Sequence, residues 1–163
     1  MALSLNQIGY RHPAEWEPHE ATWIGWPANR TDWPGKFAPV EPVMVQFVAI
    51  LSAGELVRIN VLDEAHEKHV AALLEGKATA GNVRFHRFPT NDAWCRDHGA
   101  IFVTNRNTRG SLLALDFRFN SWGGKYPPWD QDDKVPRALA RLLGLPSFSP
   151  GIVLEGGSID VDG

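Results

Sequence analysis

Apolar and polar residues alternate along the chain with two different periods, which separates short strands from helices. Between residues 20 and 90, apolar positions two apart indicate strands and positions three and four apart indicate helices, with Pro and Gly at the breaks. The predicted elements, in order, are a strand Ala21–Trp26, a helix from Val40 to Leu51, a strand Leu56–Val61, a helix capped by Asp63, and a strand Val83–Phe88.

The second half of the chain has a different order of predicted elements. It predicts, in order, a hairpin of Ala100–Thr104 with Leu112–Asp116, a loop Asn120–Trp129, a helix from Val135 to Leu143, and a final strand pair, Ile152–Leu154 with Ser158–Val161. Strands alternating with helices and joined by a hairpin favour an α/β fold with mixed strand pairing. The last residues, Asp162-Gly163, give a hairpin signal without a return strand, so we expect a fragment with an unpaired edge that self-associates.

Composition excludes several classes of protein. With 44% hydrophobic residues the 163-residue chain is expected to form a globular core. A net charge of −3, with both signs interspersed, leaves no basic patch for a nucleic acid or an anionic membrane. No apolar run approaches the ~20 residues of a membrane span, which favours a cytoplasmic protein, and one cysteine excludes an internal disulfide or a cysteine-based zinc cluster.

Chemically reactive side chains concentrate in the segment Asp92–Gly99, which reads Asp-Ala-Trp-Cys-Arg-Asp-His-Gly. A carboxylate can take two N–H bonds from a guanidinium while an aromatic ring stacks on its face. On this interpretation Asp97 binds a planar cation, Trp94 packs on it, and Asp92 lies at the mouth of the pocket. The structural alternative is an ion pair between Arg96 and Asp97 with Trp94 in the core. Because a regular strand would point Trp94 and Asp97 to opposite faces, the shared pocket requires a turning backbone.

Other candidate sites are weaker. Glu155-Gly156-Gly157 places a carboxylate at a strand end beside two residues that permit close approach, although a plain turn with a solvated Glu explains it equally well. Cys95 lacks an identifiable base, which favours an inert thiol over a nucleophile. Gly123-Gly124-Lys125 lacks the spacing of a phosphate-binding loop. His66 and His69 lie one helical turn apart and could share a metal, but no third ligand has an obvious spacing, which favours a solvated helix face.

Five blocks of sequence, taken together and in order, resemble the agmatine deiminase family, which is grouped with the bacterial-type peptidylarginine deiminases. The blocks are Pro13-Ala-Glu-Trp-Glu-Pro-His-Glu-Ala-Thr-Trp23, Asp32-Trp-Pro-Gly-Lys36, Thr90-Asn-Asp-Ala-Trp-Cys-Arg-Asp97, Phe119-Asn-Ser-Trp-Gly-Gly-Lys125 and Glu155-Gly-Gly-Ser-Ile-Asp-Val-Asp-Gly163. The resemblance covers the chain from about residue 13 to its last residue.

This resemblance implies a hydrolase that needs no cofactor and no metal, folded as a five-fold pseudosymmetric α/β propeller of the guanidine-modifying type. Residues 1–163 would form the N-terminal part of a single domain, about two propeller modules. The substrate would be the small cationic guanidine agmatine, converted with water to N-carbamoylputrescine and ammonia on the route to putrescine. Asp97 matches the first guanidinium-binding carboxylate, Trp94 the aromatic in the same pocket, and Glu155 the acid that orients the catalytic histidine.

The family's catalytic cysteine, its histidine and its second carboxylate have no counterpart in these residues, so we expect them beyond Gly163 and expect the 163-residue chain alone to be inactive. Two alternatives stay open at this point. One is deimination of peptidyl-arginine, which would need an open rim around the site. The other is a non-catalytic binding module whose loop tryptophans stack on sugars or quaternary amines.

Overall fold

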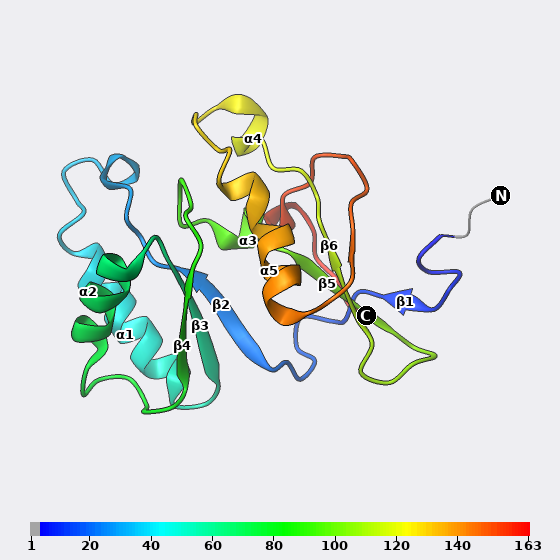
Figure 1. The fold of residues 1–163 in the computed structure, drawn as a ribbon, viewed down its shortest axis with the longest axis horizontal. Coiled ribbons are helices and arrows are strands. Elements are labelled where there is room, and N and C mark those ends of the chain that lie inside the picture. Colours follow the sequence, from blue (N-terminus) through cyan, green and yellow to red (C-terminus); the bar gives the residue numbers. More distant parts are fainter. Residues whose placement is uncertain (1–3) are drawn as a thin grey trace. The chain divides into compact units, whose positions relative to one another are not determined.

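The computed structural model describes residues 4–163, which divide into two compact units (Figure 1). The parallel unit comprises His19–Cys95, and the mixed unit comprises the chain up to Pro18 together with Arg96–Gly163. Within residues 4–163, no helix has the length and apolar character needed to cross a membrane.

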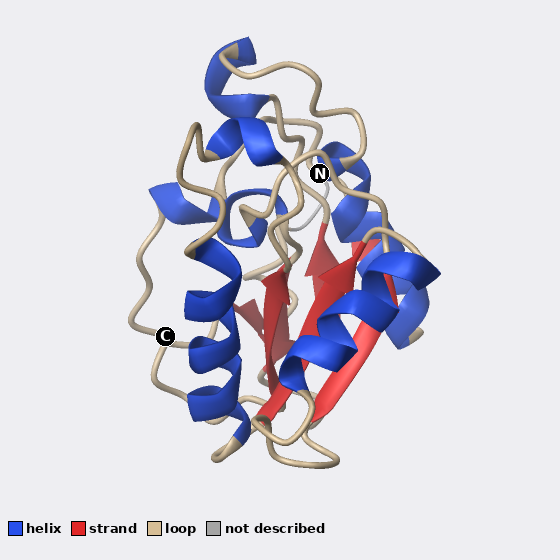
Figure 2. Ribbon diagram, turned by 90° about the vertical axis from the view of Figure 1, so that its left-hand side faces the viewer, coloured by secondary structure: helices blue, strands red, loops and turns tan. Residues whose placement is uncertain are grey.

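The parallel unit is a three-stranded sheet with two helices on one face (Figure 1 and Figure 2). Both pairings, β2 with β3 and β3 with β4, are parallel. Parallel neighbours require crossovers, and the two helices supply them. In chain order its elements are β2 (Ala21–Gly25), a 3₁₀ turn (Arg30–Asp32), α1 (Val40–Ser52), β3 (Leu56–Val61), α2 (Glu64–Leu74) and β4 (Val83–Arg87).

Alternation along the central strand builds the core of this unit. Val57, Ile59 and Val61 of β3 are each at most 1% exposed and pack in one cluster with residues of α1 and α2. Burying each such side chain contributes about 1.5–3 kcal/mol. Helix α2 begins where expected, because the Asp63 side chain accepts the backbone N–H of His66 at 2.8 Å.

The mixed unit contains a four-stranded sheet in the order β1-β5-β6-β7. β5 pairs antiparallel with both β1 and β6, and the short β7 pairs parallel with β6. Its elements are β1 (Tyr10–Arg11), β5 (Ile101–Asn105), β6 (Leu112–Leu115), α4 (Ser121–Gly124), a 3₁₀ turn (Asp132–Lys134), α5 (Val135–Leu143), β7 (Ser147–Phe148) and a 3₁₀ turn (Gly156–Ser158). The one-turn helix α3 (Cys95–His98) begins on the last residue of the parallel unit.

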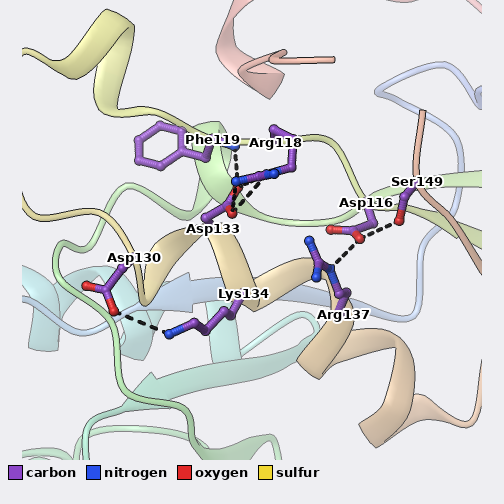
Figure 3. A network of polar contacts seen from close by, with 8 residues as sticks. All are labelled: Asp116, Arg118, Phe119, Asp130, Asp133, Lys134, Arg137 and Ser149. Atoms are coloured by element: carbon purple, nitrogen blue, oxygen red, sulfur yellow. Dashed lines mark hydrogen bonds and ion pairs between the residues drawn. The ribbon is translucent and has the colours of Figure 1, made fainter. Parts of the chain in front are cut away.

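Two carboxylates anchor helix α5 and the turn before it to the chain that comes after β6 (Figure 3). Asp116, 0% exposed, accepts hydrogen bonds from Arg137 Nε and Ser149 Oγ, both at 2.6 Å. Asp133 accepts from Arg118 Nε at 2.9 Å and from the backbone N–H of Phe119 at 2.8 Å. The backbone at Phe119 is therefore held in a fixed position.

The elements predicted up to residue 116 are confirmed, with ends shifted by one or two residues. The helix predicted from Val135 to Leu143 is also confirmed, closed by left-handed Gly144. The final strand pair is wrong. Val153 makes only a single bridge to Arg118, and Gly156–Ser158 forms a 3₁₀ turn, so Ser158–Val161 gains no pairing partner among the described residues.

Candidate functional site

The dense segment Asp92–Gly99 has a turning backbone, as a shared pocket requires. Its residues Cys95–His98 form one helical turn instead of the start of a strand. The segment also divides between the units, since Cys95 ends the parallel unit and Arg96 begins the longer stretch of the mixed unit. Each half of the segment therefore has its own surroundings.

Asp97 lies in the mixed unit with most of its hydrogen-bonding capacity unused. Its Oδ1 accepts the backbone N–H of Gly157 at 3.2 Å. Among residues 4–163, no other donor contacts this carboxylate. An ionised carboxylate offers about four acceptor positions, so Asp97 can still receive a bidentate donor.

Two glycines let the chain approach Asp97 closely. A Cβ on Gly157 would stand 2.4 Å from Asp97 Oδ1, and a Cβ on Gly156 would stand 2.4 Å from the carbonyl oxygen of Arg96. Neither distance is compatible with a side chain unless something moves. The sequence pattern of Glu followed by two glycines thus has a steric cause, which is the contact of this turn with the helical turn that carries Asp97.

Glu155 stands at the start of the same turn. Its backbone carbonyl accepts from the Ser158 hydroxyl at 2.6 Å, while its side chain makes no capping bond. Within the described part of the chain, no donor contacts the half-buried Glu155 carboxylate. The structure therefore brings the Glu155 turn and Asp97 together across 60 residues, counted from Asp97 to Gly157.

The side chain of Arg96 pairs with Glu15 and not with its neighbour Asp97. Its Nη2 donates to Glu15 at 2.6 Å and to the carbonyl of Ile159 at 3.3 Å. The hydrogen bond to Glu15 raises the pKa of the Arg96 guanidinium, and the same bond lowers the pKa of the Glu15 carboxyl. The alternative of a structural Arg96–Asp97 ion pair is therefore wrong, because the partner of Arg96 is Glu15.

Trp94 and Asp92 lie in the parallel unit, near the loop after β2. The Trp94 ring is 38% exposed and sits 5.7 Å from the ring of Trp33, so it is not a core residue. Asp92 Oδ1 accepts from Asn29 Nδ2 at 2.8 Å. Sequence reasoning did not single out Asn29, although its position just before the Asp32-Trp33 block was a usable signal.

Cys95 lies beside the backbone of β2, with its Sγ 3.3 Å from the carbonyl oxygen of Trp23. Gly25, two residues on, would carry a Cβ only 3.0 Å from the carbonyl oxygen of Ala93. The end of β2 and the segment Asp92–Cys95 are thus in close contact. Because Trp94 and Asp97 belong to different units, the pocket that they are predicted to share stays a prediction.

Comparison with known sequence families shows which family the chain belongs to. The profile of the Porphyromonas-type peptidyl-arginine deiminases matches residues 11–163. The chain belongs to this family. The resemblance inferred from the five sequence blocks is therefore confirmed.

Several of its relatives are agmatine deiminases. The agmatine deiminase of Ectopseudomonas mendocina (strain ymp) is 36% identical over 160 residues, which is 95% of this chain and 42% of that protein. That of Medicago truncatula is 35% identical over 165 residues, again covering 95% of this chain and 42% of the relative. The chain thus spans less than half the length of these relatives.

Solved structures give the same result for the fold. The agmatine deiminase of Enterococcus faecalis superposes with a TM-score of 0.85 at 32% identity, covering 97% of this chain and 42% of that one. The enzyme of C. jejuni superposes with a TM-score of 0.77 at 26% identity, covering 100% and 46%. The predicted α/β class is confirmed, and the fold is that of the corresponding part of an agmatine deiminase.

Proposed function

We propose that the protein carrying this chain hydrolyses agmatine to N-carbamoylputrescine and ammonia. One observation supports this most directly: Asp97 keeps an open carboxylate edge beside the glycine turn of Glu155, in a chain whose relatives are agmatine deiminases. In the reaction, the oxygen of water becomes bonded to the guanidinium carbon and one carbon–nitrogen bond breaks. The released nitrogen leaves as ammonia.

Each site residue has a distinct part in this proposal. Asp97 takes two N–H bonds from the guanidinium, a geometry that fixes the plane of the cation. Trp94 stacks on that plane, and Asp92 lies at the mouth of the pocket. Glu155 orients a histidine that moves protons as ammonia leaves, and a cysteine thiolate attacks the guanidinium carbon to give a covalent thiouronium. The resemblance assigns that histidine and cysteine to positions outside these 163 residues.

The remaining expectations belong to the same proposal. Residues 1–163 form part of a single domain built as a five-fold α/β propeller, and the two α/β units fit two of its modules. The reaction serves putrescine formation in the cytoplasm and needs neither cofactor nor metal. The 163-residue chain associates with itself through its unpaired strand edges.

Kinetics of ammonia release by the protein as its gene encodes it will test the assignment. Asp97→Asn keeps the shape of the side chain but removes the charge that holds the cation. Losing a bidentate charge-assisted contact is expected to lower kcat/KM for agmatine by about 100-fold or more. Asp130→Asn, which removes an exposed carboxylate paired with Lys134, is the matched control and should change it less than about two-fold. Absence of ammonia release by the unmodified protein, or equal rates for the two variants, would refute the proposal.

Deimination of peptidyl-arginine is the second candidate, and the name of the matching family favours it. The two substrates share the guanidinium and its methylene chain, and they differ in the group at the far end of that chain. Comparing kcat/KM for agmatine and for an arginyl peptide decides between them.

A non-catalytic binding module is the third candidate, and ligand-binding measurements distinguish it from a deiminase. Trp16 is 76% exposed, which suits a stacking surface. Such a module predicts tryptophan fluorescence changes with sugars or quaternary amines that survive Asp97→Ala. Loss of agmatine binding in that variant would instead favour the deiminase.

A further inference from the structure

The segment after Phe119 has a backbone that side chains rarely adopt. Four consecutive residues, Ser121–Gly124, have positive φ, with Trp122 at φ 54° and ψ 49°. The bonds from Gly124 N–H to the Asn120 carbonyl (2.7 Å) and from Lys125 N–H to the Ser121 carbonyl (2.9 Å) make this a left-handed turn. For a bulky residue such as Trp, this conformation is strained.

The hydrogen bonds that hold the turn do not involve the indole. Ser121, 1% exposed, donates its hydroxyl to the carbonyl of Tyr126 at 3.0 Å. The Asn120 side chain accepts the backbone N–H of Gly123 at 2.8 Å, and Asp133 holds the N–H of Phe119. A glycine at position 122 would satisfy the same bonds with less strain. The large aromatic ring therefore needs another explanation than the turn itself.

The Trp122 ring is linked through Phe119 and Arg118 to the segments that carry Asp97 and Glu155, all within the mixed unit. It contacts Phe119 edge-on at 5.4 Å, and Phe119 contacts His98, the residue after Asp97, at 5.8 Å. Arg118, just before Phe119, bonds through its carbonyl to the N–H of Leu154 at 3.2 Å, one residue before Glu155. Arg118 and Phe119, which lead into the left-handed turn, thus contact the segments on both sides of the candidate site.

Two rings form a corner at this place. Tyr126 stands nearly perpendicular to Trp122, at 82° and 5.9 Å, and the two are 53% and 36% exposed. Lys125 Nζ lies 5.2 Å from the centre of the Tyr126 ring, so the ammonium group of Lys125 already makes a cation–π contact with that ring. The face of an indole attracts the same kind of cation and also packs against methylene groups.

We propose that Trp122 is a specificity-determining residue, whose indole packs on the alkylammonium arm of the guanidine substrate at the corner that it forms with Tyr126. This rests on the proposed function, since Asp97 would hold the other end of the same substrate. Lys125 adds a like charge next to the arm, which limits the affinity for a substrate with two positive charges.

The test compares agmatine with n-butylguanidine, which lacks the terminal ammonium, in ammonia-release kinetics of the protein as its gene encodes it. Trp122→Leu keeps an apolar side chain and the left-handed strain but removes the π face. We expect KM for agmatine to rise about five- to thirty-fold, with kcat within about two-fold, while KM for n-butylguanidine changes much less. Trp16→Leu, which removes an even more exposed indole of the mixed unit, should leave both constants unchanged.

Lys125→Gln should change KM for agmatine in the direction opposite to Trp122→Leu. Removing the like charge should lower KM for agmatine about two- to five-fold and leave n-butylguanidine unaffected. Equal effects of either substitution on both substrates would overturn the assignment of Trp122 while leaving the deiminase proposal standing. If the unmodified protein releases no ammonia from agmatine, the deiminase proposal fails and this inference fails with it.

Discussion

Gly157→Ala should disturb the carboxylate of Asp97 more directly than any change to Asp97's own neighbours in sequence. The new Cβ would stand 2.4 Å from Asp97 Oδ1, where ordinary contact needs about 3.4 Å or more. The φ of Gly157 is not positive, so alanine is otherwise compatible with the backbone. The carboxylate must therefore move, and the bond from Gly157 N–H at 3.2 Å is lost or bent.

The cost can be worked out from these contacts. Overpacking costs about 1–3 kcal/mol, with the lower end expected where a side-chain terminus can move away. The lost hydrogen bond adds about 1 kcal/mol, since it is long and partly exposed. Against this, the change from Gly to Ala reduces the entropy of the unfolded chain and stabilises by about 0.4–1 kcal/mol. The net expectation for Gly157→Ala is a loss of about 1–2 kcal/mol.

Urea denaturation of the 163-residue chain, compared between variants at one fixed chain concentration, measures this loss as a shift in midpoint. Two further glycines serve as references. Gly156→Ala should cost more, because its Cβ would meet the backbone carbonyl of Arg96 at 2.4 Å, and backbone moves less easily than a carboxylate. Gly54→Ala is the control, since its Cβ would meet nothing closer than the Leu51 carbonyl at 3.9 Å. Its effect should stay within about 0.5 kcal/mol. A Gly157→Ala chain as stable as the Gly54→Ala chain, with unchanged agmatine kinetics in the whole protein, would refute the steric argument.

Four other predictions concern activity, association, charge and pH. The 163-residue chain alone should release no ammonia from agmatine, and measurable turnover in a coupled ammonia assay would mean that Cys95 acts as a nucleophile or that the rest of the protein is present in the preparation. The same chain should elute and scatter light as an oligomer, and a strictly monomeric, cooperatively melting species would contradict the prediction of self-association. Glu15→Gln should release Arg96 from its 2.6 Å contact and let it compete for Asp97, which weakens agmatine binding in the whole protein by a few-fold, measured by calorimetric titration. The bond from Arg11 lowers the pKa of Glu17 to about 2 from its usual 4.5, so its stabilisation is complete above pH 4.5 and is lost as the pH falls through 2. The difference in urea midpoint between the unmodified chain and Glu17→Gln should therefore close between these two pH values.

The sequence predicts the parallel unit well because each of its elements carries a local signal. Helix α1 has apolar residues at helical spacing, and β3 alternates with a buried face of Val57, Ile59 and Val61. Asp63 caps α2 as its position before the helix suggests. Such signals depend only on neighbours within one or two turns of the chain, so a single sequence contains them.

The elements that sequence reasoning missed depend on contacts between distant segments. Ile152–Leu154 alternates like a strand, but only Val153 finds a partner, and the N–H of Gly157 goes to Asp97 instead of to a neighbouring strand. The left-handed turn at Ser121–Gly124 has no periodic signal, and it depends on Asp133 and on a buried hydroxyl. In both cases hydrogen bonds from outside the segment decide the backbone.

The surroundings of Asp97 explain why Arg96 and Asp97, adjacent in sequence and opposite in charge, do not pair with each other. In sequence, Arg96 beside Asp97 suggests mutual neutralisation. In the structure, the helical turn Cys95–His98 sends the two side chains to different partners, Arg96 to Glu15 and Asp97 to the N–H of Gly157. A single neutral donor at 3.2 Å leaves Asp97 without an ion-pair partner among the described residues, although the Arg96 guanidinium still acts on it electrostatically. A carboxylate without such a partner binds a guanidinium more strongly than one already paired. The ion pair of Arg96 with Glu15 therefore matters to the site because it keeps the Arg96 guanidinium from pairing directly with Asp97.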